Sequence, residues 1–411
     1  MSTKNHSASD ERPDRRRVLR LAGGSLALAA LGVGAVGCRE EDAVVGDDSE
    51  TPDGRTPSKG AAPKDGQAPE PLWTKSTSAQ TYGDNDELVA TDGVVIATGD
   101  PLAGLDAATG KERWSQEDGA TPGAPLLLGN GTLYLASGMY DGTVRGYDPA
   151  TGKETWRSHL GKEYRQPKPV AVDEKQVYVI AEVLEDDYSS HTNVIAALNS
   201  STGKVAWKEQ RDLGTRENGV HAVVQGRYLV YTDFKKNLTV RDTATGQQVW
   251  TQKTDLTNWG FFAVHEGLVI IPQREKLQAF DLSDGTEKWS LKTEKYTSFK
   301  APAVLEDVLY VADSATTLWA VDPQTGKEIW TSTSLADADV QEPHQFAKAG
   351  GTLYAATDLD KQGGVHAIDA KTGDLLWTFN DKSGDYHSWL VATDGKHVFA
   401  LHGEKLHALP A

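Results

Sequence analysis

A block that recurs about every 40 residues is the feature that most constrains this chain, because self-similarity at such a period is typical of propeller and solenoid folds. Seven copies follow, with occasional replacements, the pattern hydrophobic-Asp-x-x-Thr-Gly-x-x-x-Trp. They end at Trp114, Trp156, Trp207, Trp250, Trp289, Trp330 and Trp377. The repeat predicts the architecture before any local propensity is considered, and it leaves the ligand open.

Each period contains short apolar runs separated by turn residues, such as residues 132–136 and 144–147 and the run that ends at Trp156. This spacing predicts four antiparallel strands in each blade of a propeller, which we name A to D from the inside outwards. We expect the Asp-x-x-Thr-Gly step to form the C–D turn. Asp accepts hydrogen bonds from the backbone that follows it, and Gly adopts the positive φ that returns the chain.

The two ends of the chain carry complementary fragments of one further unit. Residues 398–401 and 406–409 match strands B and C, but no fourth strand follows them. Residues 71–74, which include Trp73, match an outer strand that has no strands before it. Pairing the two fragments removes a free sheet edge. The sequence therefore predicts an all-β, eight-bladed β-propeller of four-stranded antiparallel blades over residues 71–411, with the last blade closed by the N-terminal strand; the alternative is a seven-bladed ring with a stray end.

The residues before the repeats read as an export signal and a linker. Basic residues 15–17 and the apolar stretch 21–37 resemble a twin-arginine signal peptide, which we assign to residues 1–37. Residues 35–38 resemble a bacterial lipobox, so we expect Cys38 to carry a lipid. Residues 38–70 have the composition of a disordered tether. We expect an extracytoplasmic protein, anchored to the outer face of the cell membrane as a lipoprotein; the alternative is an uncleaved N-terminal membrane anchor.

Charge and cysteine content exclude several classes of function. The formal net charge of −17 argues against nucleic acid as a partner, because no basic stripe is available to displace counterions. Cys38 is the only cysteine, so the chain cannot form an internal disulfide. We expect a monomer.

Turn lengths indicate which end of the propeller binds. The predicted A–B and C–D turns are uniformly short and share one face. Length varies on the opposite face, where the B–C and D–A connections lie. Its expanded segments are residues 182–193, 208–219, 331–343 and 358–364. Insertions concentrated on one face of a repeat array usually mark its binding face, and we call this face the variable face.

Residues that open the A strands should surround the channel mouth on the variable face. They are Lys168, His221, Trp259, Lys300, His344, Gln345, His387 and Trp389. Such histidines, lysines and tryptophans could line a pocket for an anionic or planar ligand; the alternative is that each is an ordinary rim residue. The histidine spacing matches no metal motif, and the acidic run 182–187 lacks the spacing of a calcium loop. We therefore expect no metal site.

The block at residues 320–330 resembles the repeat of the pyrroloquinoline-quinone (PQQ) binding-like propeller superfamily, and the resemblance covers residues 71–409. That superfamily includes quinoprotein dehydrogenases, the propeller lipoprotein of the outer-membrane barrel-assembly machinery, and sensor domains of actinobacterial kinases. In its export signals the chain is more similar to an actinobacterial surface lipoprotein, with the barrel-assembly lipoprotein as a distant relative.

Resemblance to the dehydrogenases implies a quinone beside a vicinal disulfide, with Ca²⁺ held by Glu, Asn and Asp. The propeller contains no cysteine, and no Ser-His-Asp pattern, paired carboxylate or phosphate-binding loop replaces that site. We therefore expect a non-catalytic, membrane-tethered scaffold or sensor that binds a protein partner or small ligand through its variable face and needs no cofactor. The alternative is a PQQ-dependent oxidoreductase that uses PQQ and Ca²⁺ at the channel mouth.

Overall fold

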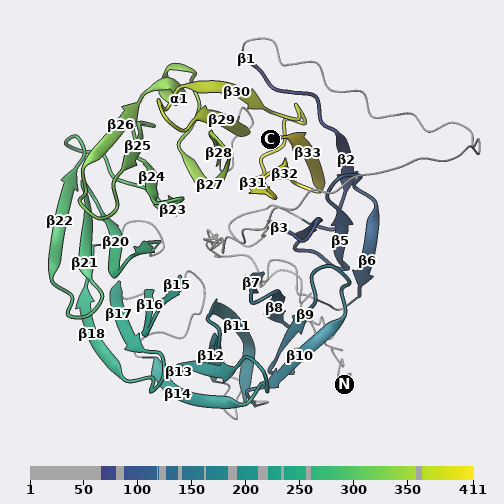
Figure 1. The fold of residues 1–411 in the computed structure, drawn as a ribbon, viewed down its shortest axis with the longest axis vertical. Helices are drawn as coiled ribbons and strands as arrows, with labels where there is room; N and C mark the ends of the chain where they lie inside the picture. The colour runs from purple at the N-terminus through teal and green to yellow at the C-terminus, as the bar shows by residue number, and fades with distance from the viewer. Residues whose placement is uncertain are drawn as a thin grey trace, which may run out of the picture.

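The structure is a ring of β-sheets seen face-on in Figure 1. This computed structural model describes residues 66–79, 88–117, 119, 126–137, 141–161, 163–183, 192–211, 221–232, 236–255, 261–357 and 363–411. Within that part, the strands form eight antiparallel meanders, which we number as blades 1 to 8 in chain order. The predicted all-β, eight-bladed architecture is confirmed.

Blades 1 to 4 each take their four strands from one continuous segment. In order from strand A to strand D they are β3 (Leu88–Thr91), β4 (Val94–Ala97), β5 (Leu102–Asp106) and β6 (Glu112–Gln116); β7 (Leu127–Gly129), β8 (Thr132–Ala136), β9 (Thr143–Tyr147) and β10 (Glu154–His159); β11 (Tyr164–Val172), β12 (Gln176–Val183), β13 (Thr192–Asn199) and β14 (Val205–Arg211); and β15 (Ala222–Gln225), β16 (Tyr228–Thr232), β17 (Asn237–Asp242) and β18 (Gln248–Lys253).

Blades 5 to 8 continue the ring. They consist of β19 (Ala263–His265), β20 (Leu268–Gln273), β21 (Lys276–Asp281) and β22 (Glu287–Lys292); β23 (Ala303–Leu305), β24 (Val308–Ala312), β25 (Leu318–Val321) and β26 (Glu328–Ser332); β27 (Pro343–Ala349), β28 (Thr352–Thr357), β29 (Val365–Asp369) and β30 (Leu375–Phe379); and β31 (Trp389–Thr393), β32 (His397–His402) and β33 (Lys405–Pro410), which is followed in the sheet by β2 (Trp73–Ser76). One short helix, α1 (Ser334–Asp337), lies between blades 6 and 7.

Blade 8 closes the ring with strands from both ends of the chain. Strand β2 pairs antiparallel with β33, from Trp73 opposite Ala408 to Ser76 opposite Lys405. The Leu72 N–H extends this ladder by donating to the Ala408 carbonyl at 2.8 Å. The predicted closure by the N-terminal strand is confirmed, and no seven-bladed arrangement fits these pairs.

A second N-terminal strand, β1 (Gly66–Gln67), was not predicted. It lies parallel to β30, with Gly66 opposite Trp377, and makes blade 7 a five-stranded sheet. Residues 66 and 67 belong to the stretch that the sequence assigns to a disordered tether. Residues 1–65, including the signal peptide and Cys38, lie outside the described part of the chain.

The repeated tryptophans join each blade to the next. Seven of them donate their indole N–H to a backbone carbonyl in the C–D turn of the following blade, at 2.7 to 3.3 Å: Trp73 to Ala107, Trp114 to Pro149, Trp156 to Asn199, Trp207 to Thr243, Trp250 to Leu282, Trp289 to Pro323 and Trp330 to Ala370. Trp377 has no such partner. The outer strand of blade 8 comes from the N-terminal end of the chain, so no C–D turn links it to β33. Strand β1 lies beside Trp377 instead.

The apolar core is divided among the blade interfaces. Each of eight buried clusters takes its residues from two neighbouring blades, as where Val230 and Val240 of blade 4 pack with Val269 and Ile271 of blade 5. The innermost strands of neighbouring blades also contact each other around the ring. A core of this kind is continuous only when the ring is closed. Among the described residues, no helix has the length and apolar character needed to cross a membrane.

Candidate functional site

The two ends of the propeller differ as the turn lengths predict. The Asp side chains of the C–D turns accept hydrogen bonds from backbone N–H groups two or three residues later, as Asp148 does from Ala150 at 2.9 Å and Thr151 at 3.0 Å. On the variable face, the B–C hairpin of blade 3 has longer strands than its neighbours, because β12 and β13 each span eight residues. Most of its insertion, residues 184–191, lies outside the described part, as do residues 358–362.

The eight residues predicted at the channel mouth do not form one cluster. Trp259 lies outside the described residues. Lys168 is half-buried in β11, opposite Ile180 of β12. The other six open blades 4, 6, 7 and 8 and lie in three separate places.

His221, at the start of blade 4, is a buried inter-blade residue. Its side chain is only 5% exposed, and its Nε2 lies 3.1 Å from the Phe262 carbonyl of the next blade. The ring packs edge-on against the ring of Phe262, with centroids 4.6 Å apart. Burial lowers the pKa of His221 to about 4, so the imidazole is neutral near pH 7. It therefore offers a ligand no positive charge.

Lys300 and His344 lie where blade 6 meets blade 7. The Lys300 ammonium forms an ion pair with Glu342, with Nζ and Oε1 2.5 Å apart. Glu342 comes two residues before His344, which is half-buried in β27. The charge of Lys300 is thus balanced within the protein, and this site is weaker for anions than the sequence suggests.

Gln345, His387 and Trp389 come together between blades 7 and 8. Gln345 accepts a hydrogen bond from the Val391 N–H at 2.9 Å. The Trp389 ring is fully buried and stacks on His402, with centroids 4.1 Å apart and planes 8° apart. His387 lies edge-on to the same His402 ring at 5.9 Å. The two His402 contacts lie within blade 8, whereas Trp389 also packs edge-on against Phe379 of blade 7, with centroids 5.9 Å apart.

A buried carboxylate completes this cluster and was not predicted. The Asp381 Oδ2 lies 3.1 Å from His402 Nδ1 and 3.8 Å from His407 Nε2. His407 in turn hydrogen-bonds Thr74 of β2 at 2.9 Å, so the cluster reaches the ring closure. Burial alone would raise the pKa of Asp381, but interactions with His402 and His407 outweigh it and hold that pKa well below its usual range. Asp381 is therefore ionised and helps to fix the last blade.

The cluster between blades 7 and 8 does not have the geometry of a catalytic triad. Both Asp381 and Ser383 approach the same nitrogen of His402, its Nδ1, at 3.1 and 3.4 Å. In a triad the base contacts the nucleophile and the carboxylate through different nitrogens. The described residues also contain no group of three or more His, Cys, Asp or Glu side chains that could hold a metal ion. The arrangement supports packing rather than bond chemistry.

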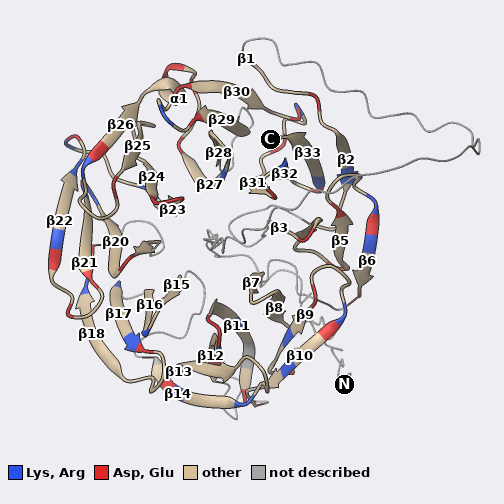
Figure 2. Cartoon of the chain, in the orientation of Figure 1, with Lys and Arg blue, Asp and Glu red and all other residues tan. Residues whose placement is uncertain are grey.

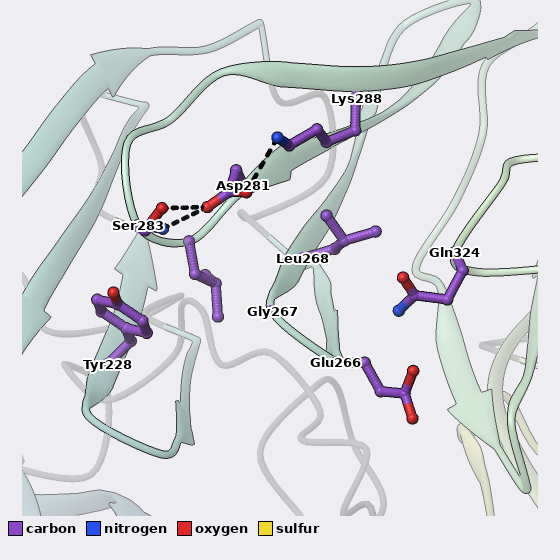
Figure 3. A pocket seen from close by; sticks show the side chains of 9 residues that line it. Tyr228, Glu266, Gly267, Leu268, Asp281, Ser283, Lys288 and Gln324 are labelled. Carbon is purple, nitrogen blue, oxygen red and sulfur yellow. Dashed lines mark hydrogen bonds and ion pairs between the residues drawn. The ribbon is translucent and has the colours of Figure 1, made fainter.

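A cavity of about 430 Å³ lies on the opposite face, where the turns are short. Figure 3 shows its lining around blade 5, with Tyr228 of blade 4 on one side and Gln324 of blade 6 on the other. The Asp281 carboxylate accepts two hydrogen bonds from Ser283, through its N–H and its hydroxyl, and pairs with Lys288 at 3.1 Å. The hydrogen bonds from Ser283 hold the pKa of Asp281 below its usual value. The Asp281 charge is matched by Lys288 within the turn. The cavity is thus formed by the repeated turn, and its lining does not favour a particular ligand.

In the described part of the variable face, two large aromatic side chains are exposed. Tyr296, in the connection between β22 and β23, is 84% exposed, and Tyr386, between β30 and β31, is 59% exposed. The Tyr296 backbone N–H donates to the Glu275 carboxylate at 3.0 Å, which holds the loop in place. Tyrosines displayed in this way are enriched at protein interfaces. Sequence patterning could not identify them, because neither residue belongs to the repeat.

Comparison with known proteins places the chain among propellers of similar repeat. The family described as outer membrane protein assembly factor BamB matches residues 64–182, 102–258 and 191–358. The assembly factor BamB of Shewanella oneidensis is 23% identical over 236 residues, which cover 53% of this chain and 56% of that protein. The polyvinylalcohol dehydrogenase of a Sphingopyxis species is 26% identical over 230 residues, which cover 46% of this chain and 31% of that enzyme.

Solved structures show the same fold. The crystal structure of BamB from Moraxella catarrhalis superposes with a TM-score of 0.58 at 13% sequence identity, covering 83% of this chain and 99% of that one. Identity at this level supports the fold alone. The matched segments span little more than half of the Shewanella factor and about a third of the dehydrogenase.

Proposed function

We propose that this chain, which belongs to the outer membrane protein assembly factor BamB family, is a non-catalytic propeller that binds a protein partner through its variable face. The exposed Tyr296 on its ordered loop carries the proposal. The relatives named as assembly factors support a role toward other proteins. The channel mouth supports a small-ligand site less well, because His221 and Trp389 are buried and Lys300 is paired.

We also propose that the protein uses neither PQQ nor Ca²⁺. Similarity to a polyvinylalcohol dehydrogenase is the observation that favours the oxidoreductase alternative. Quinone chemistry, however, needs a cation on the quinone oxygen and a base near the substrate hydroxyl. The chain has one cysteine, at position 38, and the described residues hold no carboxylate cluster suited to a cation. The residues present do not fit the cofactor.

Titration with PQQ and Ca²⁺ tests this second proposal. We expect no stoichiometric uptake at micromolar concentrations and no dye-linked oxidation of alcohols or sugars. Stoichiometric uptake with Ca²⁺-dependent turnover, lost when His344 or His387 is changed to alanine, would establish the oxidoreductase alternative instead.

We propose that the protein acts outside the cytoplasmic membrane, tethered by a lipid on Cys38. The signal-like residues 1–37 support this placement. Changing Cys38 to Ser should move the protein from the membrane fraction to the soluble fraction, since a lipid chain supplies the anchor. A membrane-bound Cys38→Ser protein would instead point to an uncleaved N-terminal segment, which protein sequencing of the mature N-terminus would reveal.

Affinity capture from solubilised envelopes tests the binding face. The full-length protein and a Tyr296→Ala, Tyr386→Ala variant serve as baits, with Val249→Ala, Ile329→Ala as the matched control, because Val249 and Ile329 are exposed apolar residues on outer strands. We expect the tyrosine variant to lose most of the captured partner and the control to keep it, since interface aromatics often dominate binding. Equal capture by the wild-type protein and the tyrosine variant would refute the assignment of the face.

A further inference from the structure

Basic side chains gather on the variable face of blades 4 and 5, although the whole chain carries a formal net charge of −17. Among the described residues, six exposed basic residues lie in the connections and strand ends there: Lys236, Lys253, Arg274, Lys276, Lys292 and Lys295. Three exposed acidic residues lie among them, Asp255, Glu275 and Glu294, and the Asp255 Oδ2 is 3.9 Å from the Arg274 Nε. We call the six basic residues and Tyr296 the basic patch. Figure 2 shows both blue and red segments on β22, which ends in this part of the ring.

Hydrogen bonds join the connections that carry the patch into one surface. The Thr254 N–H donates to the Lys236 carbonyl at 2.8 Å, which ties the end of β18 to the B–C turn of its own blade. The next residue, Asp255, donates its N–H to the Gln273 side chain of blade 5 at 3.0 Å. The basic patch therefore spans two blades without a break.

Two lysines of the patch face each other across a pair of strands. Lys276 of β21 and Lys292 of β22 are direct partners in the antiparallel ladder. Like charges at opposed positions destabilise a sheet. Repulsion between Lys276 and Lys292 lowers the stability of the sheet, and an anionic group from a partner would remove this repulsion.

Tyr296 stands within the patch on a backbone that most residues avoid. Its φ is +71°, and Lys236 and Arg274 also have positive φ values, of 60° and 52°. Bulky residues adopt this region only when their surroundings enforce it, and such positions often serve function. The Lys295 ammonium lies 4.7 Å from the centre of the Tyr296 ring, so the aromatic group and the cation are presented together.

We propose that the basic patch binds an acidic segment of the partner protein, with Tyr296 as the central contact. This inference rests on the proposed function and names the chemistry of the partner at that face. The patch presents several basic groups together with an aromatic ring, and the Lys295 ammonium lies 4.7 Å from the centre of that ring. This arrangement suits a segment whose carboxylates are separated by neutral residues. Asp255, Glu275 and Glu294, placed among the lysines, would oppose a uniformly anionic membrane surface.

A glutamate-rich peptide labelled with fluorescein serves as the probe, and fluorescence anisotropy measures its binding to the full-length protein. We expect Lys276→Glu, Lys292→Glu to weaken binding at least tenfold. The matched control, Lys153→Glu, Lys204→Glu, makes the same charge change at exposed positions of two C–D turns on the opposite face, and it should bind as the wild type does. Binding should also weaken as salt is raised, because screening acts on exposed charges.

A single substitution separates binding from folding. Lys276→Glu places a carboxylate opposite Lys292, so the variant should melt slightly above the wild type while binding the peptide more weakly. Gain of stability with loss of binding is a result that misfolding cannot produce.

Three outcomes would overturn the inference: no peptide binding by the wild type, equal weakening in both double variants, or binding to phosphatidylglycerol vesicles in preference to the peptide. None of them bears on the proposed function, which is tested by the effect of the Tyr296 and Tyr386 substitutions on capture of the partner protein. A fourth outcome also overturns the inference: if the tyrosine variant loses its partner while the lysine variants keep it, the face is correct and the acidic partner is wrong.

Discussion

Gly152 lies beneath the ring of Trp114, where one blade meets the next. A Cβ added to Gly152 would come within 2.5 Å of that ring, and its φ of +67° already disfavours any other residue. The same pair recurs around the propeller, as for Gly246 beneath Trp207 and Gly326 beneath Trp289. The repeat therefore conserves a contact between blades as well as a turn.

Substitution of Gly152 by alanine separates the contact from the turn. We expect a loss of about 1 kcal/mol from the backbone strain and a further loss of about 1 to 3 kcal/mol from the clash with Trp114. Gly131 provides the control, because it has a φ of +69° and no atom within 4 Å of its added Cβ. Urea unfolding measures both variants. If Gly131→Ala and Gly152→Ala lose the same free energy, the packing role of the glycine is wrong.

His366 makes stability depend on pH. Burial lowers its pKa from 6.5 to about 4 in the folded protein, and its Nδ1 lies 2.9 Å from Thr378 Oγ1. The unfolded chain therefore binds the proton first as the pH falls below 6.5, so stability is lost between about pH 6.5 and pH 4. One such group contributes a slope of up to about 1.4 kcal/mol per pH unit.

Changing His366 to Gln should remove this part of the slope. Gln278 occupies the equivalent position of strand C in blade 5, so the fold accepts the amide there. Unfolding free energies measured at several pH values between 4 and 7 check the prediction. An unchanged slope in His366→Gln would mean that His366 titrates normally in the folded protein.

At the scale of strands, ring closure depends on β2. A chain that begins at residue 71 lacks only β1, whereas a chain that begins at residue 79 also lacks β2 and Trp73. We expect the first truncation to change the melting temperature little. The second should lower it sharply, because blade 8 loses its outer strand, the indole bond from Trp73 to Ala107 and the packing of the partly buried Trp73 ring. Thermal unfolding followed by circular dichroism compares the two, and similar melting temperatures would refute closure by β2.

The strands of the ring could be predicted, but β1 could not. Asp148, Gly152 and Trp156 perform local chemistry that every copy repeats, so the pattern determines the turn and the strand beside it. Gly66 and Gln67 carry no strand pattern. Their pairing with β30 arises from unpaired backbone groups at the edge of blade 7, which no local sequence signals.

The environments of the channel-mouth residues could not be predicted from the sequence, for a physical reason. A residue that opens strand A can face the channel or the next blade, and sequence periodicity does not distinguish the two. His221 and Trp389 turn toward neighbouring blades and are buried, whereas Lys168 is half-buried. The basic patch was missed because Lys236, Arg274 and Lys292 are distant in sequence, and only the fold brings their loops together.

At the scale of the whole molecule, the propeller has a uniform face, formed by the A–B and C–D turns, and a variable face opposite it. The uniform face repeats one turn in which an Asp carboxylate accepts backbone hydrogen bonds, as Asp148 and Asp281 do. The variable face carries the exposed tyrosines and the basic patch. In such a ring the core and the repeated turns can stay the same while the loops of the variable face differ to fit a partner.

Site-specific photocrosslinking in cells tests this separation most directly. A photoreactive amino acid is placed at Tyr296 on the variable face or at Lys153 in a C–D turn, both of which are exposed. If the variable face binds the partner, position 296 should give a crosslinked protein adduct and position 153 should give none. An adduct from position 153 alone, or from neither position while the protein is present in the envelope, would contradict it.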